Sequence, residues 1–170
     1  SYAELALIRD ADDIAHPAFA KMFVQTERLG DAILATRRRR TPTEPEIWSA
    51  HLLVAEDAEA GSIAAETDRA RFLGRGRSMR DAAAMDGRAL SNSTGTVLDA
   101  VFALRCRVTV APGSVIHVAF WTMVAGSRDA LADAMDKRRD AAAFDRASTL
   151  AWTQAQVQLR HLGIRPTEAE

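Results

Sequence analysis

Twelve residues in the first half of the chain bring together the side chains best suited to chemistry. The stretch from Glu66 to Arg77 reads ETDRARFLGRGR and holds two acids, four arginines and two glycines. Arginine presents a planar fork of donors that matches carboxylates and phosphates. Glycine lets the backbone turn sharply and approach a ligand closely. The stretch therefore predicts a polar ligand site, although a solvated loop between two strands can have the same composition.

Two carboxylates at the start of this stretch have the spacing of a catalytic pair. Glu66 and Asp68 are two positions apart, so a strand would place both on one face. Paired carboxylates perform glycoside hydrolysis at separations of about 5 Å or about 6.5–9.5 Å. The alternative is structural, because ion pairs with Arg69, Arg71 or Arg75 would lower the pKa of each carboxyl and spoil it as an acid. We expect the ion pairs and assign no catalytic residue.

Composition excludes several classes of protein. The 170 residues suit one domain with or without an appendage, and 48% hydrophobic with 26% charged residues is ordinary for a globular chain. A net charge of −1 argues against a dedicated nucleic-acid binder. The chain has no apolar run of eighteen residues, which a membrane-spanning helix would need. It opens at Ser1 without methionine, so we expect a piece of a longer protein.

Other reactive residues do not group into recognisable sites. The single cysteine, Cys106, lies in a β-rich run and is expected to be a small buried hydrophobe. The histidines lack the spacing of metal ligands, and no P-loop or nucleophile elbow occurs, so we expect neither metal nor cofactor. The run Arg37 to Arg40 has no aromatic or basic surroundings. Strand alternation would place two of these arginines on each face, which predicts a solvated strand end.

The first hundred residues read as strands separated by turns. We expect a turn at Asp12–Pro17, because the residue before proline avoids the helical region. Further strands are expected over the apolar runs 19–24, 32–36 and 47–54. The segment 56–61 predicts a hairpin turn from the last of these back into 62–66.

The next segment predicts a β-hairpin. Alternate residues from Phe102 to Val110 are apolar, with Arg105, Arg107 and Thr109 between them. Pro112 and Gly113 then fit a type II turn, and a second strand is expected over 115–124.

The last segment changes to helix. Ser127 can cap a helix that continues to about Arg139, and Asp140 a longer one that ends near Gly163. The longer helix carries one apolar stripe and additional apolar residues such as Trp152. We therefore expect it to pack against a further protein segment.

Several motifs together resemble a known family. They are HPAF at 16–19, FVQTE at 23–27, ATRR at 35–38, ETDR at 66–69, FLGR at 72–75, LSNS at 90–93 and PG at 112–113. In this order they resemble the β-sandwich domain that precedes the catalytic barrel in glycoside hydrolase family 94, also called the glycosyltransferase 36-associated domain. The tail LAWTQAQVQLR at 150–160 is similar to that of bacterial cyclic β-1,2-glucan synthases.

The resemblance implies a mainly β fold: an antiparallel supersandwich over residues 1–125, followed by linker helices over 126–170 that lead to an (α/α)6 barrel. The family's general acid and phosphate-binding groups lie on that barrel. The implied partners are therefore the barrel, a second copy of the chain and β-glucan, with no nucleic acid and no membrane contact by this segment. The implied location is the cytoplasmic side of a bacterial inner membrane.

Two functions remain open. The first is a non-catalytic structural and interface module of a carbohydrate-active enzyme. The second is an autonomous carbohydrate-binding module that uses the arginine-rich loop. Under either one, the candidate rim or interface contacts that the resemblance implies are Arg69, Arg71, Arg75 and Arg77. An enzyme based on Glu66 and Asp68 is the third and least favoured reading.

Overall fold

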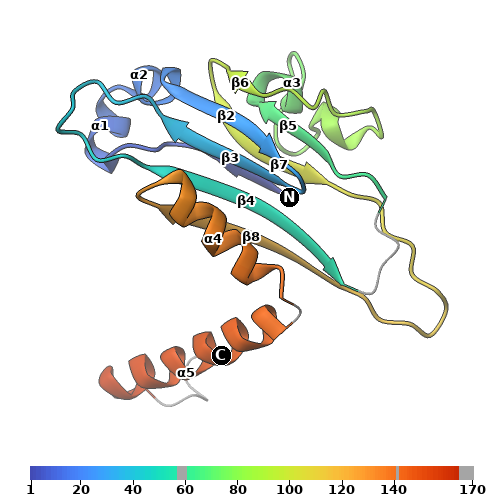
Figure 1. Ribbon diagram of the computed structural model, residues 1–170. Helices are drawn as coiled ribbons and strands as arrows, with labels where there is room; N and C mark the ends of the chain where they lie inside the picture. The colour runs from blue at the N-terminus through green and yellow to red at the C-terminus, as the bar shows by residue number, and fades with distance from the viewer. Residues whose placement is uncertain (57–60, 141, 165–170) are drawn as a thin grey trace. The chain divides into compact units, whose positions relative to one another are not determined.

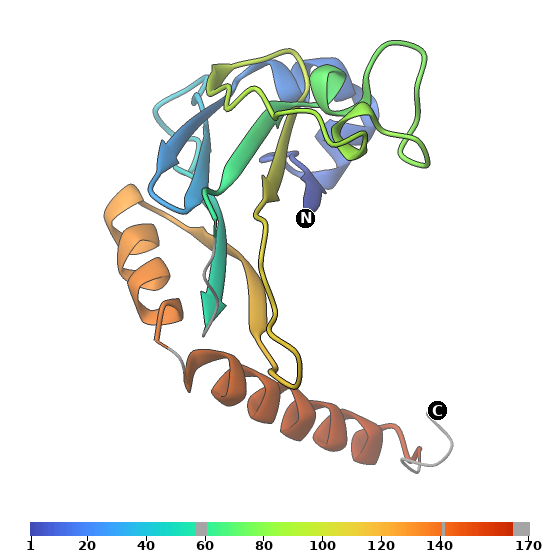
Figure 2. The same cartoon turned by 90° about the vertical axis from the view of Figure 1, so that its right-hand side faces the viewer.

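The computed structural model describes residues 1–56, 61–140 and 142–164. The chain divides into two compact units, Ser1–Met135 and Asp136–Glu170, and each is described by itself. Within the described residues the first unit contains two antiparallel sheets (Figures 1 and 2). This confirms the predicted class, an antiparallel β-sandwich followed by helices.

The N-terminal segment is more helical than predicted. Strand β1 (Tyr2–Glu4) is followed by helices α1 (Asp10–Ala15) and α2 (Pro17–Met22). The predicted turn at Asp12–Pro17 and the strand over 19–24 were therefore wrong. The first turn of α1 carries three aspartates, which favour a helix N-terminus, and Pro17 occupies the start of α2, where no backbone donor is required.

The smaller sheet has three strands in the order β1-β7-β5, with β7 (Ala100–Arg105) in the centre and β5 (Ala64–Asp68) at one edge. The larger sheet has the order β6-β2-β3-β4-β8. Its strands are β6 (Gly95–Thr96), β2 (Val24–Leu29), β3 (Ala32–Arg37), β4 (Trp48–Glu56) and β8 (His117–Ala125). The predicted strands over 32–36 and 47–54 are confirmed.

Both sheets are covered on two faces, which gives the unit four layers. Ile33, Leu53 and Phe102 belong to the core between the two sheets. On the other face of the larger sheet, Leu34 and Leu52 pack against Leu131 and Met135 of α4 (Arg128–Arg138), which lies along that sheet (Figure 1). The outer face of the smaller sheet is covered by the segment that follows β5.

The predicted hairpin at Pro112-Gly113 was wrong in its pairing, although the turn itself is present. Gly113 has a φ of 79°, and the backbone N–H of Ser114 donates to the carbonyl of Ala111. However, β7 pairs with β1 and β5, whereas β8 pairs with β4 in the other sheet. Alternation suggested a half-buried strand, but Val101 and Ala103 are as buried as Phe102, because β7 is central and covered on both faces.

The predicted hairpin between residues 47–54 and 62–66 was also wrong. β4 and β5 belong to different sheets, so the connection between them crosses from one layer to the other. Residues 57–60 of the predicted turn lie outside the described residues. Gly61 is held by its backbone N–H, which donates to the carbonyl of Arg107.

The two predicted helices are confirmed. Ser127 Oγ accepts a hydrogen bond from the backbone N–H of Ala130 at the start of α4. Asp140 caps α5 (Ala142–His161) through the N–H of Ala142. On α5, Leu150 is 69% exposed and Trp152 is 67% exposed. Among the described residues, no helix is long and apolar enough to cross a membrane.

Candidate functional site

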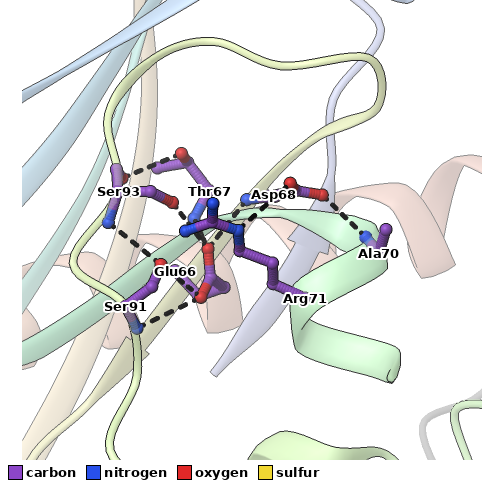
Figure 3. Close-up of polar contacts among 7 residues, drawn as sticks. All are labelled: Glu66, Thr67, Asp68, Ala70, Arg71, Ser91 and Ser93. Atoms are coloured by element: carbon purple, nitrogen blue, oxygen red, sulfur yellow. Dashed lines mark hydrogen bonds and ion pairs between the residues drawn. The ribbon is translucent and has the colours of Figure 1, made fainter. Parts of the chain in front are cut away.

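The stretch from Glu66 to Arg77 begins within β5 and continues into a short helix. The pairing of β5 with β7 shifts register between Glu66 and Asp68. Helix α3 (Arg69–Leu73) follows at once, and Asp68 is its N-cap because its Oδ1 accepts from the N–H of Ala70 at 2.9 Å. Figure 3 shows the Asp68 and Glu66 carboxylates turned to different partners. The two acids are therefore not arranged as a matched pair.

Glu66 is the centre of a buried polar cluster. Its side chain is 2% exposed and accepts five hydrogen bonds. Oε1 accepts from the N–H groups of Thr67 and Asp68 and, at 2.7 Å, from Ser93 Oγ. Oε2 accepts from the N–H of Ser91 and, at 2.7 Å, from Ser91 Oγ (Figure 3). The LSNS segment thus wraps the carboxylate and supplies it with donors.

These donors decide the ionisation of Glu66. Burial would raise the pKa of the carboxyl, but the hydrogen bonds from Ser91, Ser93 and the backbone N–H groups outweigh burial and hold the pKa below its ordinary value. Glu66 is therefore an ionised carboxylate at neutral pH, with both oxygens occupied. A catalytic acid needs the opposite, a raised pKa and a free oxygen that faces substrate.

The expected ion pairs are confirmed for Asp68 and wrong for Glu66. Arg71 Nε lies 3.7 Å from Asp68 Oδ2. Within the described residues, no arginine forms an ion pair with Glu66. The physical reason is local: Glu66 is buried beside residues 91–93, and the hydroxyls of Ser93 and Ser91 donate to Oε1 and Oε2 respectively. A guanidinium in their place would itself have to be buried, which is costly.

The four predicted arginines do not converge on one point. Arg69 Nε lies 2.9 Å from Glu4 Oε1 and 3.7 Å from Asp99 Oδ2, which joins α3 to β1. Arg77 Nη1 lies 2.6 Å from Asp86 Oδ2. Arg71 is bound to Asp68. In the part of the chain that the structure describes, Arg75 is exposed and has no ion pair or hydrogen bond of its side chain.

The first glycine of the loop serves packing. Gly74 has φ 83° and ψ 156°, a region essentially restricted to glycine. A Cβ added there would lie 2.7 Å from Cβ of Ala83, which begins the 3-10 helix η1 (Ala83–Met85). Gly76 has φ 71° and open space around it. Gly74 therefore permits close contact of the loop with η1.

A cavity of about 690 Å³ lies beside the same loop and was not predicted from the sequence. Its walls are mainly apolar and include Phe72 of α3, Leu104 of β7 and Phe120 of β8. Arg105 lies at its side and donates to the carbonyls of Ala84 and Arg88. The walls come from segments far apart in the chain, so no local sequence motif predicts the cavity.

The remaining candidates are placed in the framework. Cys106 is half-buried with a free thiol. His51 is buried between the rings of Phe102 and Phe120, and its two nitrogens lie 2.8 Å from the hydroxyls of Ser1 and Thr122. Burial, with a smaller effect of the Ser1 amino group, lowers the pKa of His51 to about 4. Within residues 1–56, 61–140 and 142–164, no cluster of three metal-ligating side chains occurs.

Comparison with known proteins agrees with this architecture. Residues 1–141 match the family described as glycosyl hydrolase 94, supersandwich domain. The chain is 44% identical, over 172 aligned residues, to cyclic beta-(1,2)-glucan synthase NdvB of Rhizobium meliloti (strain 1021). The alignment covers 99% of this chain and 6% of that relative, so the chain spans a small part of the relative's length. The chain belongs to the glycosyl hydrolase 94 supersandwich domain family.

Proposed function

We propose that this chain is a non-catalytic structural and interface module of a carbohydrate-active enzyme of the cyclic β-1,2-glucan synthase type. One observation carries the proposal: Glu66 and Asp68, the two carboxylates weighed above as a catalytic pair, are both engaged in holding the fold. Glu66 accepts five hydrogen bonds in a buried site, and Asp68 caps α3 while it pairs with Arg71. Neither can serve as a free acid and nucleophile for a glycosidic bond.

The interface part of the proposal concerns the segment after residue 125. We propose that residues 126–170 link the sandwich to a helical barrel of the same protein. Helix α5 supports this, because Leu150, Trp152 and Val157 are exposed at 69%, 67% and 45%. Large exposed apolar side chains on one helix favour contact with another protein surface.

The activity of the longer protein is proposed from the relative. Because the chain spans 6% of a cyclic beta-(1,2)-glucan synthase, we propose that its parent builds cyclic β-1,2-glucan and that a phosphorylase-like region, to which this module belongs, trims the chains. We also propose that the module lies on the cytoplasmic side of a bacterial inner membrane and helps two copies associate.

An experiment on the chain itself tests the absence of catalysis. The isolated chain is incubated with β-1,2-glucan and phosphate, and glucose 1-phosphate is measured over hours. The proposal predicts no product above that of heat-denatured protein. Phosphorolysis that disappears in Asp68→Asn would contradict it.

The loop arginines have a narrower role in this proposal. Arg69, Arg71 and Arg77 hold the loop to Glu4, Asp68 and Asp86. We therefore propose Arg75 as the rim contact, with a sugar or with another domain. Titration of β-1,2-glucan, followed by tryptophan fluorescence and the Arg75 Nε–H NMR signal, separates the two. Saturable binding that is abolished in Arg75→Ala and retained in Arg80→Ala would establish a carbohydrate-binding module. The absence of any response at millimolar glucan would rule out that function.

A further inference from the structure

A second polar site lies away from the loop, at the end of β3. A cavity of about 350 Å³ is bounded by the segment before α1, the start of α1 and the residues that follow β3. Its lining includes four arginines, Arg9, Arg37, Arg39 and Arg40, against two carboxylates, Asp12 and Glu44. We propose that this cavity is a binding site for a phosphate-type dianion, held by the side chain of Arg37.

The buried member of the cluster is Arg37, which contradicts the predicted solvated strand end. β3 ends at this residue, so the expected alternation of four arginines does not occur. Arg37 is 9% exposed, whereas Arg38, Arg39 and Arg40 are exposed. Its guanidinium lies over the ring of Phe23, with Cζ 5.7 Å from the ring centroid. The aromatic ring holds the guanidinium plane in place but supplies no acceptor in that plane.

Two donors of Arg37 have no acceptor. Nε and Nη2 are buried without a hydrogen-bond partner, while Nη1 lies 3.7 Å from Glu44 Oε2. Nε and Nη2 are the neighbouring donors on one edge of the guanidinium, which bind two oxygens of one oxyanion side by side. Buried N–H groups of a charged side chain are costly to leave unpaired. The unpaired edge therefore points to a ligand with paired oxygens.

Glu44 does not accept hydrogen bonds from these two donors of Arg37. Its Oε2 accepts a 2.7 Å hydrogen bond from the backbone N–H of Arg40, and its Oε1 lies 3.5 Å from Arg40 Nε. The backbone hydrogen bond from Arg40 is the main cause that lowers the pKa of Glu44, so the carboxylate is charged and committed to the loop. It balances the charge of one arginine and leaves Nε and Nη2 of Arg37 buried without an acceptor.

The surrounding charge favours a dianion. Arg9, Arg39 and Arg40 are exposed around a buried floor, and the arginines outnumber the carboxylates by two. The volume is near the lower end of the ~300–1,000 Å³ of small-ligand pockets, which suits inorganic phosphate or a small phosphate ester. A neighbouring cavity of about 290 Å³ shares Asp12 and Arg40 with it and gives room for the organic part of an ester.

Arginine side-chain NMR tests the proposal directly. Inorganic phosphate is titrated into the isotopically labelled chain at constant ionic strength, with chloride as the exchanged ion, and the Nε–H signals of Arg37 and of the exposed Arg107 are followed. We expect a saturable shift of Arg37 and none of Arg107. A fluorescence-detected unfolding midpoint that rises with phosphate more than with chloride is the second readout.

Variants make the outcome decisive. Arg37→Lys keeps a positive charge but lacks the fork, and should abolish saturation; Arg40→Gln leaves the floor intact and should weaken the apparent affinity several-fold. Arg107→Gln, at an exposed position outside the cavity, should bind phosphate as the unsubstituted chain does. An Arg37 signal that responds equally to chloride and phosphate would overturn the site. Tighter binding of acetate than of phosphate would overturn the assignment of a dianion.

Discussion

Ser93 Oγ lies 2.7 Å from Glu66 Oε1, a hydrogen bond that joins residues 27 positions apart. Ser91 makes the matching contact with Oε2, so a carboxylate in the middle of β5 organises the loop that precedes β6. The residues that look most catalytic in the sequence are thus the ones that fix the loop to the sheet. A buried carboxylate with full hydrogen bonding is a structural element, and its removal should be measured as lost stability.

Replacement of Glu66 should destabilise the sandwich strongly. Glu66→Gln removes the charge that five donors surround, and we expect a loss of roughly 2–4 kcal/mol in the free energy of unfolding. Ser93→Ala should cost about 1–2 kcal/mol. Urea unfolding measures both, with the exposed Asp133→Asn as a control that should change stability by less than about 0.5 kcal/mol. Equal effects of Glu66→Gln and Asp133→Asn would contradict the structural role.

Substitution at Gly74 should separate packing from backbone strain. In Gly74→Ala the new Cβ meets Ala83 at 2.7 Å and the backbone must keep a glycine conformation, so we expect a loss of roughly 2–5 kcal/mol. Gly76→Ala has a positive φ but no neighbour within 4 Å, and should cost about 1 kcal/mol. Thermal unfolding of both variants measures the difference. The contact with η1 would be disproved if the two variants had the same stability.

Helix α4 should behave as part of the sandwich. Leu131 is 0% exposed and packs with Leu34 and Leu52, so Leu131→Ala should cost roughly 2–5 kcal/mol. Leu150→Ala on α5, where the side chain is 69% exposed, should leave the unfolding midpoint unchanged. Hydrogen exchange adds an independent readout, since α4 amides should open with the sheet. Fast exchange of α4 alongside a protected sheet would show that the helix is not a layer of this unit.

Acid should destabilise the domain in two steps. The pKa of His51 is about 4 in the folded chain against 6.5 for the free side chain. The unfolded state therefore binds more protons between these values, and the contribution is lost as pH falls from about 6.5 to 4. The lowered pKa of Glu66 adds a contribution that is present above its unfolded pKa and is lost as pH falls through its folded pKa. NMR titration of the His51 ring should give a pKa well below 6; a value near 6.5 would contradict its burial.

Local patterns in the sequence predicted β3, β4 and the two C-terminal helices, but not which strands pair with one another. Ser127 and Asp140 marked helix starts, because a cap is a property of a few neighbouring residues. The Pro112-Gly113 turn was predicted for the same reason. The assignment of β7 and β8 to different sheets depends on contacts with β5 and β4, which local alternation does not report.

Burial of polar side chains was the hardest property to predict. Arg37 stands in a run of four identical side chains, and only the end of β3 and the ring of Phe23 distinguish it from Arg38. Likewise the donors of Glu66 come from residues 91 and 93, which a local reading treats as an ordinary turn. Both sites depend on segments that meet only in the folded chain.

The most direct test uses the full-length protein that contains this domain. Glucan-forming and phosphorolytic turnover are measured per folded molecule in Asp68→Asn and Glu66→Gln, with folding checked by circular dichroism. Both variants are expected to retain kcat within about threefold of the unsubstituted protein, while Glu66→Gln unfolds at lower urea. A fall in kcat of about a hundredfold or more in a variant that remains folded would contradict the non-catalytic role of the domain.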